Sequence, residues 1–412
     1  MKIAIIGTGY VGLTSALCFA YRGHDVICVD KNEDKINKLK NNQPTIFEKK
    51  LPEILATVIT NKKIDFTTDL ARAVKESSII ILAVGTPQGF DGNADLSYIF
   101  EATREIAGYV DEYKLFITKS TVPIGTNHLI QKTIEEISKI KIDIASNPEF
   151  MREGFAIDDF LMPDRIVIGI DNQDCQKLIK QLYQPWIADQ FPIFFTNIIT
   201  AELIKYCSNA FLMTKVAFIN EIENLANKIG ANIKDVSYGM GLDKRIGAAF
   251  LNPGPGIGGS CFPKDSLALD YIANKNSIKL SIIQQVIASN NQRFHDCALR
   301  IMQSCQNHNN SRDIAILGLA FKAQTDDVRM SPAIEIIKIL LAHNFTVSAY
   351  DPEATDNAKK ILQDSINYCS SIAECYNKSS NIAILTEWQE FKSIKTFADF
   401  SSKNVIDLRY FL

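Results

Sequence analysis

MKIAIIGTGYVG, residues 1–12, decides the fold of the N-terminal part of the chain. The apolar run at residues 2–6 is too short for a helix and indicates a buried strand, after which three glycines lead into a helical stretch. Gly7 permits a tight turn, Gly9 lets the backbone approach a pyrophosphate, and Gly12 allows the helix to pack closely. The glycine spacing is informative because a strand precedes it and a helix follows it.

Asp30 completes this pattern about twenty residues further on. It ends the next strand-like run, VICVD at residues 26–30, where a carboxylate accepts hydrogen bonds from a ribose diol and repels a 2′-phosphate. We therefore predict a dinucleotide site that prefers NAD to NADP. The alternative is a tight turn followed by an ordinary acidic residue at a strand end.

Strand-like and helical segments alternate towards both ends of the chain. Further short apolar runs lie at residues 64–67, 78–84, 115–120, 141–146 and 165–170, and again at 313–322, 346–352, 381–388 and 404–410. This alternation predicts parallel sheets covered by helices. Between them, residues 200–230 hold no proline or internal glycine and repeat their apolar positions every three or four residues, which predicts one long helix.

The expected fold is therefore α/β, with two doubly wound, Rossmann-like domains joined by a long central helix. We place an N-terminal nucleotide-binding domain at residues 1–198 and a C-terminal Rossmann-like domain at 306–412. Residues 199–305 form a central helical region that also carries a glycine-rich cysteine loop.

The composition excludes several classes of partner. The 44 basic and 47 acidic residues give a net charge of −3, which is no strong field for nucleic acid or an anionic membrane. Nine cysteines, an odd number without a C-x-x-C pair, favour reduced thiols in the cytoplasm. The N-terminus lacks the features of a secretory signal, and no apolar run approaches the ~18 residues that span a bilayer.

Two polar loops follow the fourth and fifth apolar runs, at the sheet edge where open α/β folds bind ligands. V-G-T-P (84–87) contributes Thr86, and K-S-T-V-P (119–123) contributes Thr121. These hydroxyls could contact the cofactor or a water. Threonines at strand ends are also common turn formers, so each loop alone leaves both interpretations open.

The stretch G-G-S-C-F-P-K-D (258–265) carries the most informative chemistry. Cys261 supplies a nucleophile, Asp265 can hold a water or take a proton, and Gly258 gives access to the backbone. Most cysteines are inert core residues. This one lies in a glycine-rich loop of a nucleotide-binding chain, which makes it the strongest candidate among the nine.

Two further pairs of residues could take part in catalysis. Lys205 and Asn209 are four residues apart on the predicted central helix and share a face, where a cation beside an amide donor can stabilise an oxyanion. Glu149 and Glu153 lie in N-P-E-F-M-R-E-G (147–154), and one of them could act as a general base. The alternatives are solvated surface polarity for the first pair and a helix-starting acidic pair for the second.

The C-terminal region adds three cations that suit phosphate or carboxylate recognition, Lys322, Arg329 and Arg409. Plain surface positions are the alternative for each. The five histidines show no metal-ligand spacing, so we expect no metal site.

The chain contains the motifs G-T-G-Y-V-G, G-T-P, K-S-T-V-P-I-G, N-P-E-F-M-R-E-G, G-G-S-C-F-P-K-D and F-K-x-x-T-D-D-V-R-x-S-P, and the Lys205 and Asn209 pair. Together these features resemble the UDP-glucose 6-dehydrogenase family over nearly the whole chain. The resemblance implies an N-terminal NAD domain, a homodimer formed through the central helix and a C-terminal domain that holds UDP. It also implies a four-electron oxidation of UDP-glucose to UDP-glucuronate. NAD takes two hydrides in succession, and Cys261 carries the sugar as a thiohemiacetal and then as a thioester that water cleaves.

The same resemblance assigns roles to individual residues. The implied catalytic residues are the nucleophile Cys261, the oxyanion-stabilising Lys205 and Asn209, the water-positioning Asp265 and Thr121, and Glu149 as the base for thioester hydrolysis. The implied cofactor contacts are Gly7, Gly9, Tyr10, Val11, Gly12, Asp30, Lys35, Thr86, Thr121, Glu153, Lys264 and Arg329. The implied substrate contacts are Glu149, Phe150, Glu153, Lys205, Asn209, Arg245, Asn252, Gly258, Phe321, Lys322 and Arg409.

Three alternative functions remain open. Enzymes acting on GDP-mannose or a UDP-N-acetylhexosamine share the cysteine loop, so the same chemistry on another nucleotide sugar is the nearest. A two-electron hydroxyacid dehydrogenase with a lysine base on its central helix would leave Cys261 passive and yield one NADH per substrate instead of two. The third alternative is a catalytically silent nucleotide-sugar sensor, although every candidate catalytic position is filled.

Overall fold

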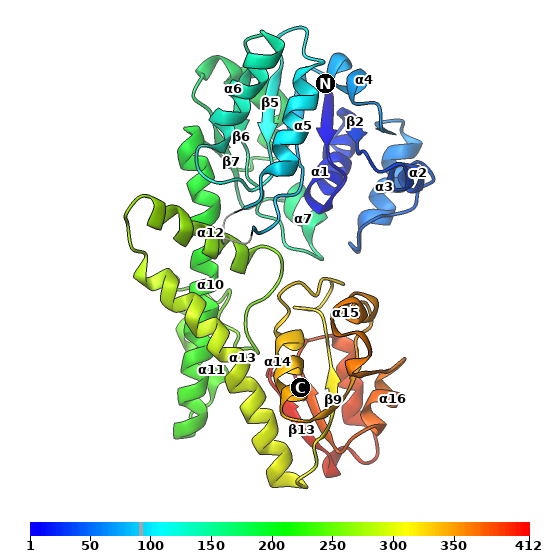
Figure 1. The fold of residues 1–412 in the computed structure, drawn as a ribbon, viewed down its shortest axis with the longest axis vertical. Helices are drawn as coiled ribbons and strands as arrows, with labels where there is room; N and C mark the ends of the chain where they lie inside the picture. The colour runs from blue at the N-terminus through cyan, green and yellow to red at the C-terminus, as the bar shows by residue number, and fades with distance from the viewer. Residues whose placement is uncertain (90–93) are drawn as a thin grey trace. The chain divides into compact units, whose positions relative to one another are not determined.

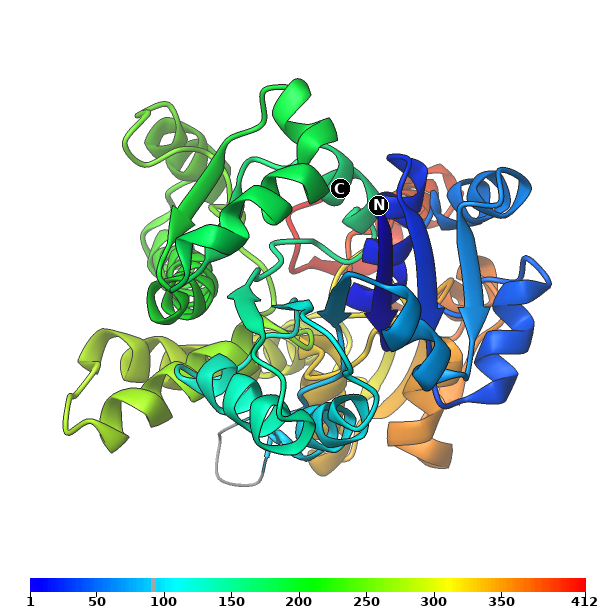
Figure 2. The same ribbon diagram turned by 90° about the horizontal axis from the view of Figure 1, so that it is seen from above.

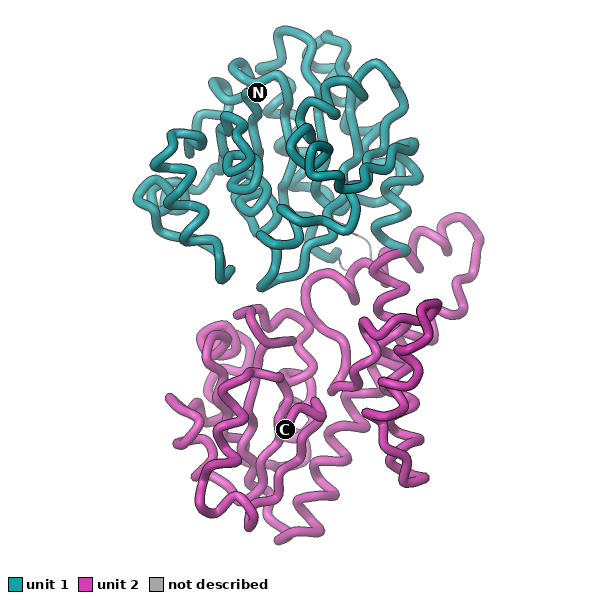
Figure 3. Tube along the Cα trace, turned by 180° about the vertical axis from the view of Figure 1, so that it is seen from behind, with its two compact units in different colours: residues 1–207 teal, residues 208–412 magenta. Residues whose placement is uncertain are grey.

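The computed structural model describes residues 1–89 and 94–412, which form two compact units, residues 1–207 and 208–412 (Figure 3). Each unit is built on one largely parallel sheet covered by helices, and the long helix α10 (Ile198–Ile229) begins in the first unit and continues into the second. The predicted α/β fold with two Rossmann-like sheets and a long connecting helix is therefore confirmed.

The first unit holds an eight-stranded sheet in the order β3-β2-β1-β4-β5-β6-β7-β8. Its strands are β1 Lys2–Ile6, β2 Asp25–Val29, β3 Ile64–Thr67, β4 Ile79–Leu82, β5 Leu115–Thr118, β6 Asp143–Ser146, β7 Ile166–Gly169 and β8 Ile193–Thr196. Its helices before α10 are α1 Tyr10–Tyr21, α2 Glu33–Lys40, α3 Leu51–Thr60, α4 Leu70–Glu76, α5 Ser97–Ala107, α6 Thr126–Ser138, α7 Ala156–Leu161, α8 Gln176–Leu182 and α9 Gln184–Ala188.

β1 shows why the short apolar runs become central strands. Ile3 and Ile5 pack into a cluster with residues of α1 and α3, whereas Ala4 and Ile6 pack into a second cluster with residues of α5 and α6. Helices thus cover both faces of the sheet (Figures 1 and 2). A strand buried on both faces requires the continuous apolar sequence seen here.

The far edge of this sheet departs from the expected all-parallel arrangement. β7 pairs antiparallel with β6, through Ser146 and Gly169, and β8 runs parallel to β7. The sequence did not predict β8 because it is an edge strand whose side chains are largely half-buried. It therefore lacks the apolar contrast that marked the central strands.

The second unit contains a parallel five-stranded sheet in the order β11-β10-β9-β12-β13. Its strands are β9 Asp313–Leu317, β10 Thr346–Tyr350, β11 Asn367–Tyr368, β12 Asn381–Ile384 and β13 Asn404–Asp407. Its helices after α10 are α11 Ile233–Gly241, α12 Phe262–Lys275, α13 Ser281–His308, α14 Pro332–Ala342, α15 Thr355–Leu362 and α16 Ile372–Asn377. Among the described residues, no helix is long and apolar enough to cross a membrane.

Candidate active site

The three glycines after β1 are needed for three different reasons. Gly7 adopts φ +103°, and a Cβ there would lie 2.7 Å from the Ala83 carbonyl oxygen. A Cβ on Gly12 would lie 2.0 Å from the Gly7 carbonyl oxygen. A Cβ on Gly9 would meet no atom of the described chain within 4 Å, and Gly9 is the N-cap of α1, whose first turn holds no acidic residue. The turn therefore fits a pyrophosphate, which needs open backbone at a helix N-terminus.

Asp30 lies directly after β2, next to this turn. Its carboxylate accepts hydrogen bonds from the Thr8 amide at 2.9 Å and the Thr8 hydroxyl at 2.5 Å, and from the Asn32 amide at 3.0 Å. Burial opposes the charge, but these donors outweigh it and hold the pKa of Asp30 below its usual range. Lys35, in the first turn of α2, adds a favourable positive charge. The charged carboxylate at the strand end fits the ribose role predicted from the sequence.

The two polar loops that follow β4 and β5 contact each other at the edge of the sheet. The Thr86 hydroxyl donates a hydrogen bond to the Thr121 carbonyl at 2.7 Å, and the Ser120 hydroxyl donates one to the Val84 carbonyl at 2.6 Å. β4 and β5 are neighbouring parallel strands, so their carboxyl ends bring the loops together. Thr121 thereby lies on the same edge as the glycine turn.

Glu149 and Lys205 form a buried ion pair in the first unit. The Lys205 ammonium donates to Glu149 Oε1 at 2.9 Å and to the Glu149 carbonyl at 2.7 Å, and the two side chains are 4% and 7% exposed. The Met151 amide donates to Glu149 Oε2 at 2.6 Å. A charge pair removed from water holds its geometry firmly, so Lys205 is fixed beside the predicted base.

Phe150 and Tyr10 reveal two partners that the sequence motifs did not predict. The Arg165 guanidinium stacks on the Phe150 ring at 3.8 Å. The Tyr10 hydroxyl donates to the buried Glu48 carboxylate, which also accepts a hydrogen bond from the Gly154 amide at 2.9 Å. Glu48 thus ties the glycine turn to the loop that carries Glu153. It lies in no recognisable motif, so only the tertiary structure could identify it.

Lys119, the first residue of K-S-T-V-P, was not a predicted site residue either. Its ammonium is buried and donates to the Asn147 amide oxygen at 2.9 Å, which also accepts a hydrogen bond from the Tyr183 hydroxyl. Burial lowers the pKa of Lys119 to about 8, although the nearby Glu149 carboxylate opposes the shift. The lysine holds the start of the N-P-E-F segment from inside the unit.

The second unit contributes a separate polar cluster. The Asn209 amide, on α10, donates to Asp265 Oδ2 at 2.6 Å, and the Lys264 ammonium lies 2.8 Å from Asp265 Oδ1. Asp265 and Asn209 are almost fully buried. Asn209 and Lys205 lie one turn apart on α10, as the sequence predicted.

Cys261 occupies the N-cap position of α12, so the helix begins inside the stretch that the sequence assigned to a loop. Pro263 lies in the first turn, and the Asp265 amide donates to the Cys261 carbonyl at 2.8 Å. Cys261 is partly exposed, whereas seven of the other eight cysteines are buried and Cys207 is exposed. A thiol at a helix N-terminus is in an environment that stabilises the thiolate.

Gly258 and Gly259 place the cysteine loop against the segment that follows β9. A Cβ on Gly258 would lie 2.3 Å from the Met330 carbonyl oxygen, and a Cβ on Gly259 would lie 2.9 Å from the Phe321 ring. The Gly259 amide also donates to the Arg329 carbonyl at 2.9 Å. The structure therefore brings together the two longest motifs of the C-terminal half.

The remaining predicted contacts differ in how they are held. The Arg409 guanidinium donates to the Phe321 carbonyl at 2.9 Å and to the Leu385 carbonyl at 2.8 Å, which places it near the same loop. Arg329 has a largely exposed side chain that pairs with Asp327. The Arg245 side chain is 89% exposed, and within the described part of the chain its polar contacts are to Asp243 alone. Val11 lies in α1, Asn252 is exposed, and Lys322 is half-buried.

The chain is similar in sequence to known proteins along nearly its whole length. Residues 1–187 match the NAD binding domain, 199–292 the central domain and 315–412 the UDP binding domain of the UDP-glucose/GDP-mannose dehydrogenase family. The UDP-glucose 6-dehydrogenase of Rhizobium meliloti (strain 1021) is 44% identical over 96% of this chain and 91% of the relative. That of Rickettsia bellii (strain RML369-C) is 44% identical over 100% and 96%.

Solved structures give the same picture of the fold. A UDP-glucose dehydrogenase from the hyperthermophilic archaeon Pyrobaculum islandicum superposes with a TM-score of 0.93 at 34% identity, covering 100% of this chain and 94% of that one. A UDP-D-ManNAc dehydrogenase from Pyrococcus horikoshii superposes with a TM-score of 0.88 at 27% identity, covering 100% and 96%.

Proposed function

The chain belongs to the UDP-glucose/GDP-mannose dehydrogenase family, and from this premise we propose that it oxidises UDP-glucose to UDP-glucuronate through covalent intermediates on Cys261. The observation that carries the proposal is a partly exposed thiol at the start of α12, four residues before an aspartate that is paired with Asn209. A cysteine is needed because a covalent link keeps the aldehyde from escaping between the two oxidations.

NAD is the cofactor, and the turn from Gly7 to Gly12 with Asp30 would hold it. When bound, NAD takes up a hydride from the sugar carbon in each of the two oxidations. Thr86 and Thr121 line the same sheet edge and would orient the ligand there. Tyr10 and Val11 begin the helix behind the turn.

Lys205 and Asn209 would stabilise the negative charge that develops on the substrate oxygen. The Lys205 ammonium is held at a fixed place by Glu149, and the Asn209 amide is oriented by Asp265. Donors that are already fixed lose no free energy to reorganisation during the reaction. Removing one such donor typically lowers the rate about 10²- to 10³-fold.

Glu149 and Asp265 are the proposed groups for moving protons. Once the Cys261 thioester has formed, Glu149 would take a proton from the attacking water, whose oxygen bonds to the acyl carbon as the carbon–sulfur bond breaks. The thiolate that leaves regains its proton from solvent, and Asp265 would help to position the attacking water. Glu149 is suited to this role because the buried Lys205 ammonium fixes the position of its carboxylate.

The C-terminal unit supplies the proposed substrate surface. Phe321 lies against Gly259, the neighbour of Gly258, and its carbonyl accepts a hydrogen bond from Arg409. Arg245, Asn252 and Lys322 of the same unit belong to the proposed set, which Phe150 and Glu153 of the first unit complete. UDP-glucose is favoured because the two relatives that are 44% identical carry that specificity in their names. Lys264, Lys35 and Arg329 remain proposed cofactor contacts.

A homodimer is part of the proposal. Phe211, Phe218 and Leu225 recur at every seventh residue on α10 and are exposed, as are Tyr238 on α11 and Leu242 directly after it. An apolar stripe of this kind on a long helix is typical of an interface. We also propose that the functional domains are residues 1–198, 199–305 and 306–412, close to the three family matches, and that the protein is cytoplasmic, as its cysteine usage indicates.

The decisive experiment measures NADH per sugar with UDP-glucose, a UDP-N-acetylhexosamine and GDP-mannose, each with NAD and with NADP. We expect two NADH per UDP-glucose and little reaction with NADP. Cys261→Ser should block the second oxidation, so that no uronate accumulates. One NADH per substrate, or uronate formed by the serine variant at the parent rate, would refute covalent catalysis. Faster turnover of another sugar would favour the alternative substrate instead.

A further inference from the structure

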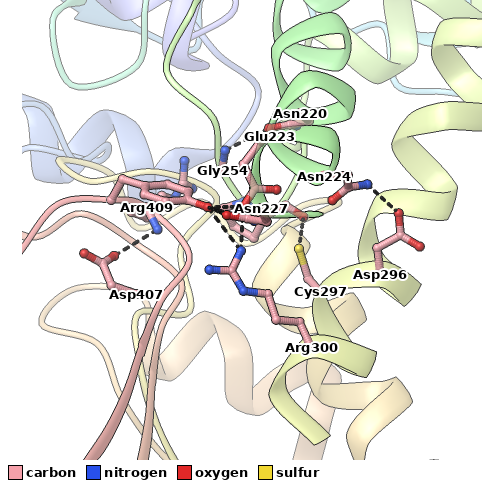
Figure 4. A network of polar contacts seen from close by, with 12 residues as sticks. Asn220, Glu223, Asn224, Asn227, Gly254, Asp296, Cys297, Arg300, Asp407 and Arg409 are labelled. Atoms are coloured by element: carbon pink, nitrogen blue, oxygen red, sulfur yellow. Dashed lines mark hydrogen bonds and ion pairs between the residues drawn. The ribbon is translucent and has the colours of Figure 1, made fainter. Parts of the chain in front are cut away.

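Glu223 lies at the centre of a buried polar network in the second unit (Figure 4). It is fully buried on α10 and accepts hydrogen bonds from Arg293 at 2.7 Å and Arg300 at 2.5 Å, both on α13. It also accepts hydrogen bonds from the Tyr410 hydroxyl and from the Asn227 amide, the latter at 2.6 Å. One carboxylate thus joins two helices to the C-terminal segment.

Arg293 extends this network to the loop that precedes Cys261. Its Nε donates to the Gly254 carbonyl at 2.9 Å, while the Gly254 amide donates to the Asn220 side chain at 2.8 Å. Both backbone groups of Gly254 are therefore held from buried side chains. Because Arg293 is itself oriented by Glu223, the carboxylate determines where this loop lies.

Tyr410 extends the network to the other wall of the proposed substrate surface. Tyr410 adopts φ +53°, a backbone region that costs free energy in a non-glycine residue and persists only when its surroundings fix it. The bond from its hydroxyl to Glu223 provides such a constraint. Its neighbour Arg409 packs against Gly254, since a Cβ on that glycine would lie 3.0 Å from the guanidinium.

The charges in the network agree with a permanently ionised carboxylate. Burial opposes the charge of Glu223, but Arg293, Tyr410 and Arg300 together hold its pKa below the usual range. The same contacts raise the pKa of Arg300 against the effect of burial. Glu223 therefore keeps its negative charge at physiological pH, and with it the ion pairs to Arg293 and Arg300.

We propose that Glu223 is a positioning residue that sets the Gly254 loop and Arg409 for the nucleotide sugar. This inference rests on the proposed function, because it assigns those two elements to the substrate. Glu223 does not touch the substrate itself. It acts through Arg293 on one wall and through Tyr410 on the other.

The test compares UDP binding, measured by calorimetry, in the parent chain and three variants. Glu223→Gln removes the charge and should weaken UDP binding about tenfold, the loss typical of one charge-assisted hydrogen bond. Tyr410→Phe keeps the carboxylate and its two arginines but removes the hydroxyl that bonds to Glu223 and accepts from Arg300 and Asn227, each at 3.2 Å, and it should weaken UDP binding severalfold. The control is Glu221→Gln, the same chemical change at an exposed position of the same helix, and it should bind UDP like the parent.

Two further readouts separate positioning from general loss of structure. The affinity for NAD should stay unchanged in all three variants, and turnover should show a raised KM for UDP-glucose with kcat largely kept. If Glu223→Gln does not fold, Tyr410→Phe decides the matter. Folded variants that bind UDP as tightly as the parent would overturn the inference and leave the proposed function intact. A parent chain that binds no UDP would overturn both.

Discussion

The sheets of the two units each begin with a strand, a glycine turn and an aspartate after the next strand, but they use these features differently. In the first, the Gly7 amide donates to the Val29 carbonyl at 2.8 Å, and Asp30 follows that strand. In the second, the Gly318 amide donates to the Tyr350 carbonyl at 2.8 Å, and Asp351 follows. Each aspartate then bonds to the turn of its own unit. The frame is therefore equivalent in both.

The difference lies in what the second turn leaves for a ligand. Asp351 is 2% exposed and accepts hydrogen bonds from the amides of Leu319 at 2.7 Å and Ala320 at 3.0 Å, and from the Trp388 indole at 3.1 Å. A Cβ on Gly318 would lie 2.4 Å from Thr386. A Cβ on its counterpart Gly7 would likewise lie 2.7 Å from the Ala83 carbonyl oxygen, so the difference lies two residues further on, where Ala320 is almost fully buried and Gly9 faces open space. A shared fold thus does not imply a shared site.

The largest expected effect comes from adding one methyl group to the first turn. Gly12→Ala would place its Cβ 2.0 Å from a backbone oxygen that cannot move cheaply, so we expect a loss of roughly 4 kcal/mol or more in stability. Gly9→Ala adds the same methyl group to open space and should fold normally, yet bind NAD at least about tenfold more weakly. Urea unfolding and NAD titration measure the two quantities.

Gly318→Ala carries this test to the second turn. Its methyl group would meet Thr386, and its φ of +102° disfavours alanine, so stability should fall while NAD affinity stays unchanged. If Gly9→Ala lost stability and kept its NAD affinity, the first turn would only stabilise the fold, as the second turn does. The comparison would then fail.

A second prediction exchanges the two aspartates for asparagine. Asp351→Asn replaces a charged carboxylate with a neutral amide that has one acceptor oxygen in place of two. The buried amides of Leu319 and Ala320 and the Trp388 indole then lose part of their acceptor, so the free energy of unfolding should fall by roughly 3 kcal/mol. Asp30→Asn should cost less stability and instead weaken discrimination against NADP, because the charge that repels a 2′-phosphate is gone. Unfolding curves and KM values for NAD and NADP measure both. An Asp30→Asn variant with unchanged NADP discrimination would exclude the ribose role.

The chain offers one tryptophan in each unit to follow such changes. Trp186 is buried in the first unit and Trp388 in the second, and the sequence holds no others. In a Trp388→Phe background, fluorescence therefore reports the first unit alone. In a Trp186→Phe background, it reports the second.

Much of the fold could be predicted because burial leaves a clear pattern. β1 and β4 are apolar at almost every position since helices cover both of their faces, and α10 keeps its helical period over its whole length. β8 escaped prediction because an edge strand with half-buried side chains has no such pattern. The antiparallel entry of β7 escaped it too, since strand direction depends on the connection and not on the strand's own residues.

The site follows the same division between local and distant information. Gly7, Gly9, Gly12 and Asp30 could be predicted because their function depends on neighbouring residues and a fixed spacing. Glu48 and Glu223 could not, because each acts on a segment about 100 or more residues away in the sequence and belongs to no short motif. The role of a buried carboxylate can be recognised only from the hydrogen-bond donors that the fold places around it.

The smallest expected effect concerns two buried charged side chains, one in each unit, that differ in their hydrogen-bond partners. Asp351 meets several donors in the second unit, whereas the Lys119 ammonium of the first unit donates to a neutral amide. Burial lowers the pKa of Lys119 to about 8, from an ordinary value of 10.5. The unfolded chain then binds more protons than the folded one between these values, so stability rises with pH across that window.

Between pH 7 and pH 9.5 this linkage adds about 2 kcal/mol to the stability of the parent first unit. Lys119→Met, which cannot titrate, should lack that gain, while Lys177→Met, at an exposed lysine of the same unit, should keep it. Urea unfolding at both pH values, followed through Trp186 in the Trp388→Phe background, measures the difference. Equal pH dependence in the parent and Lys119→Met would mean that the lysine stays charged throughout. Lys119 would then be as well satisfied in the folded first unit as Asp351 is in the second.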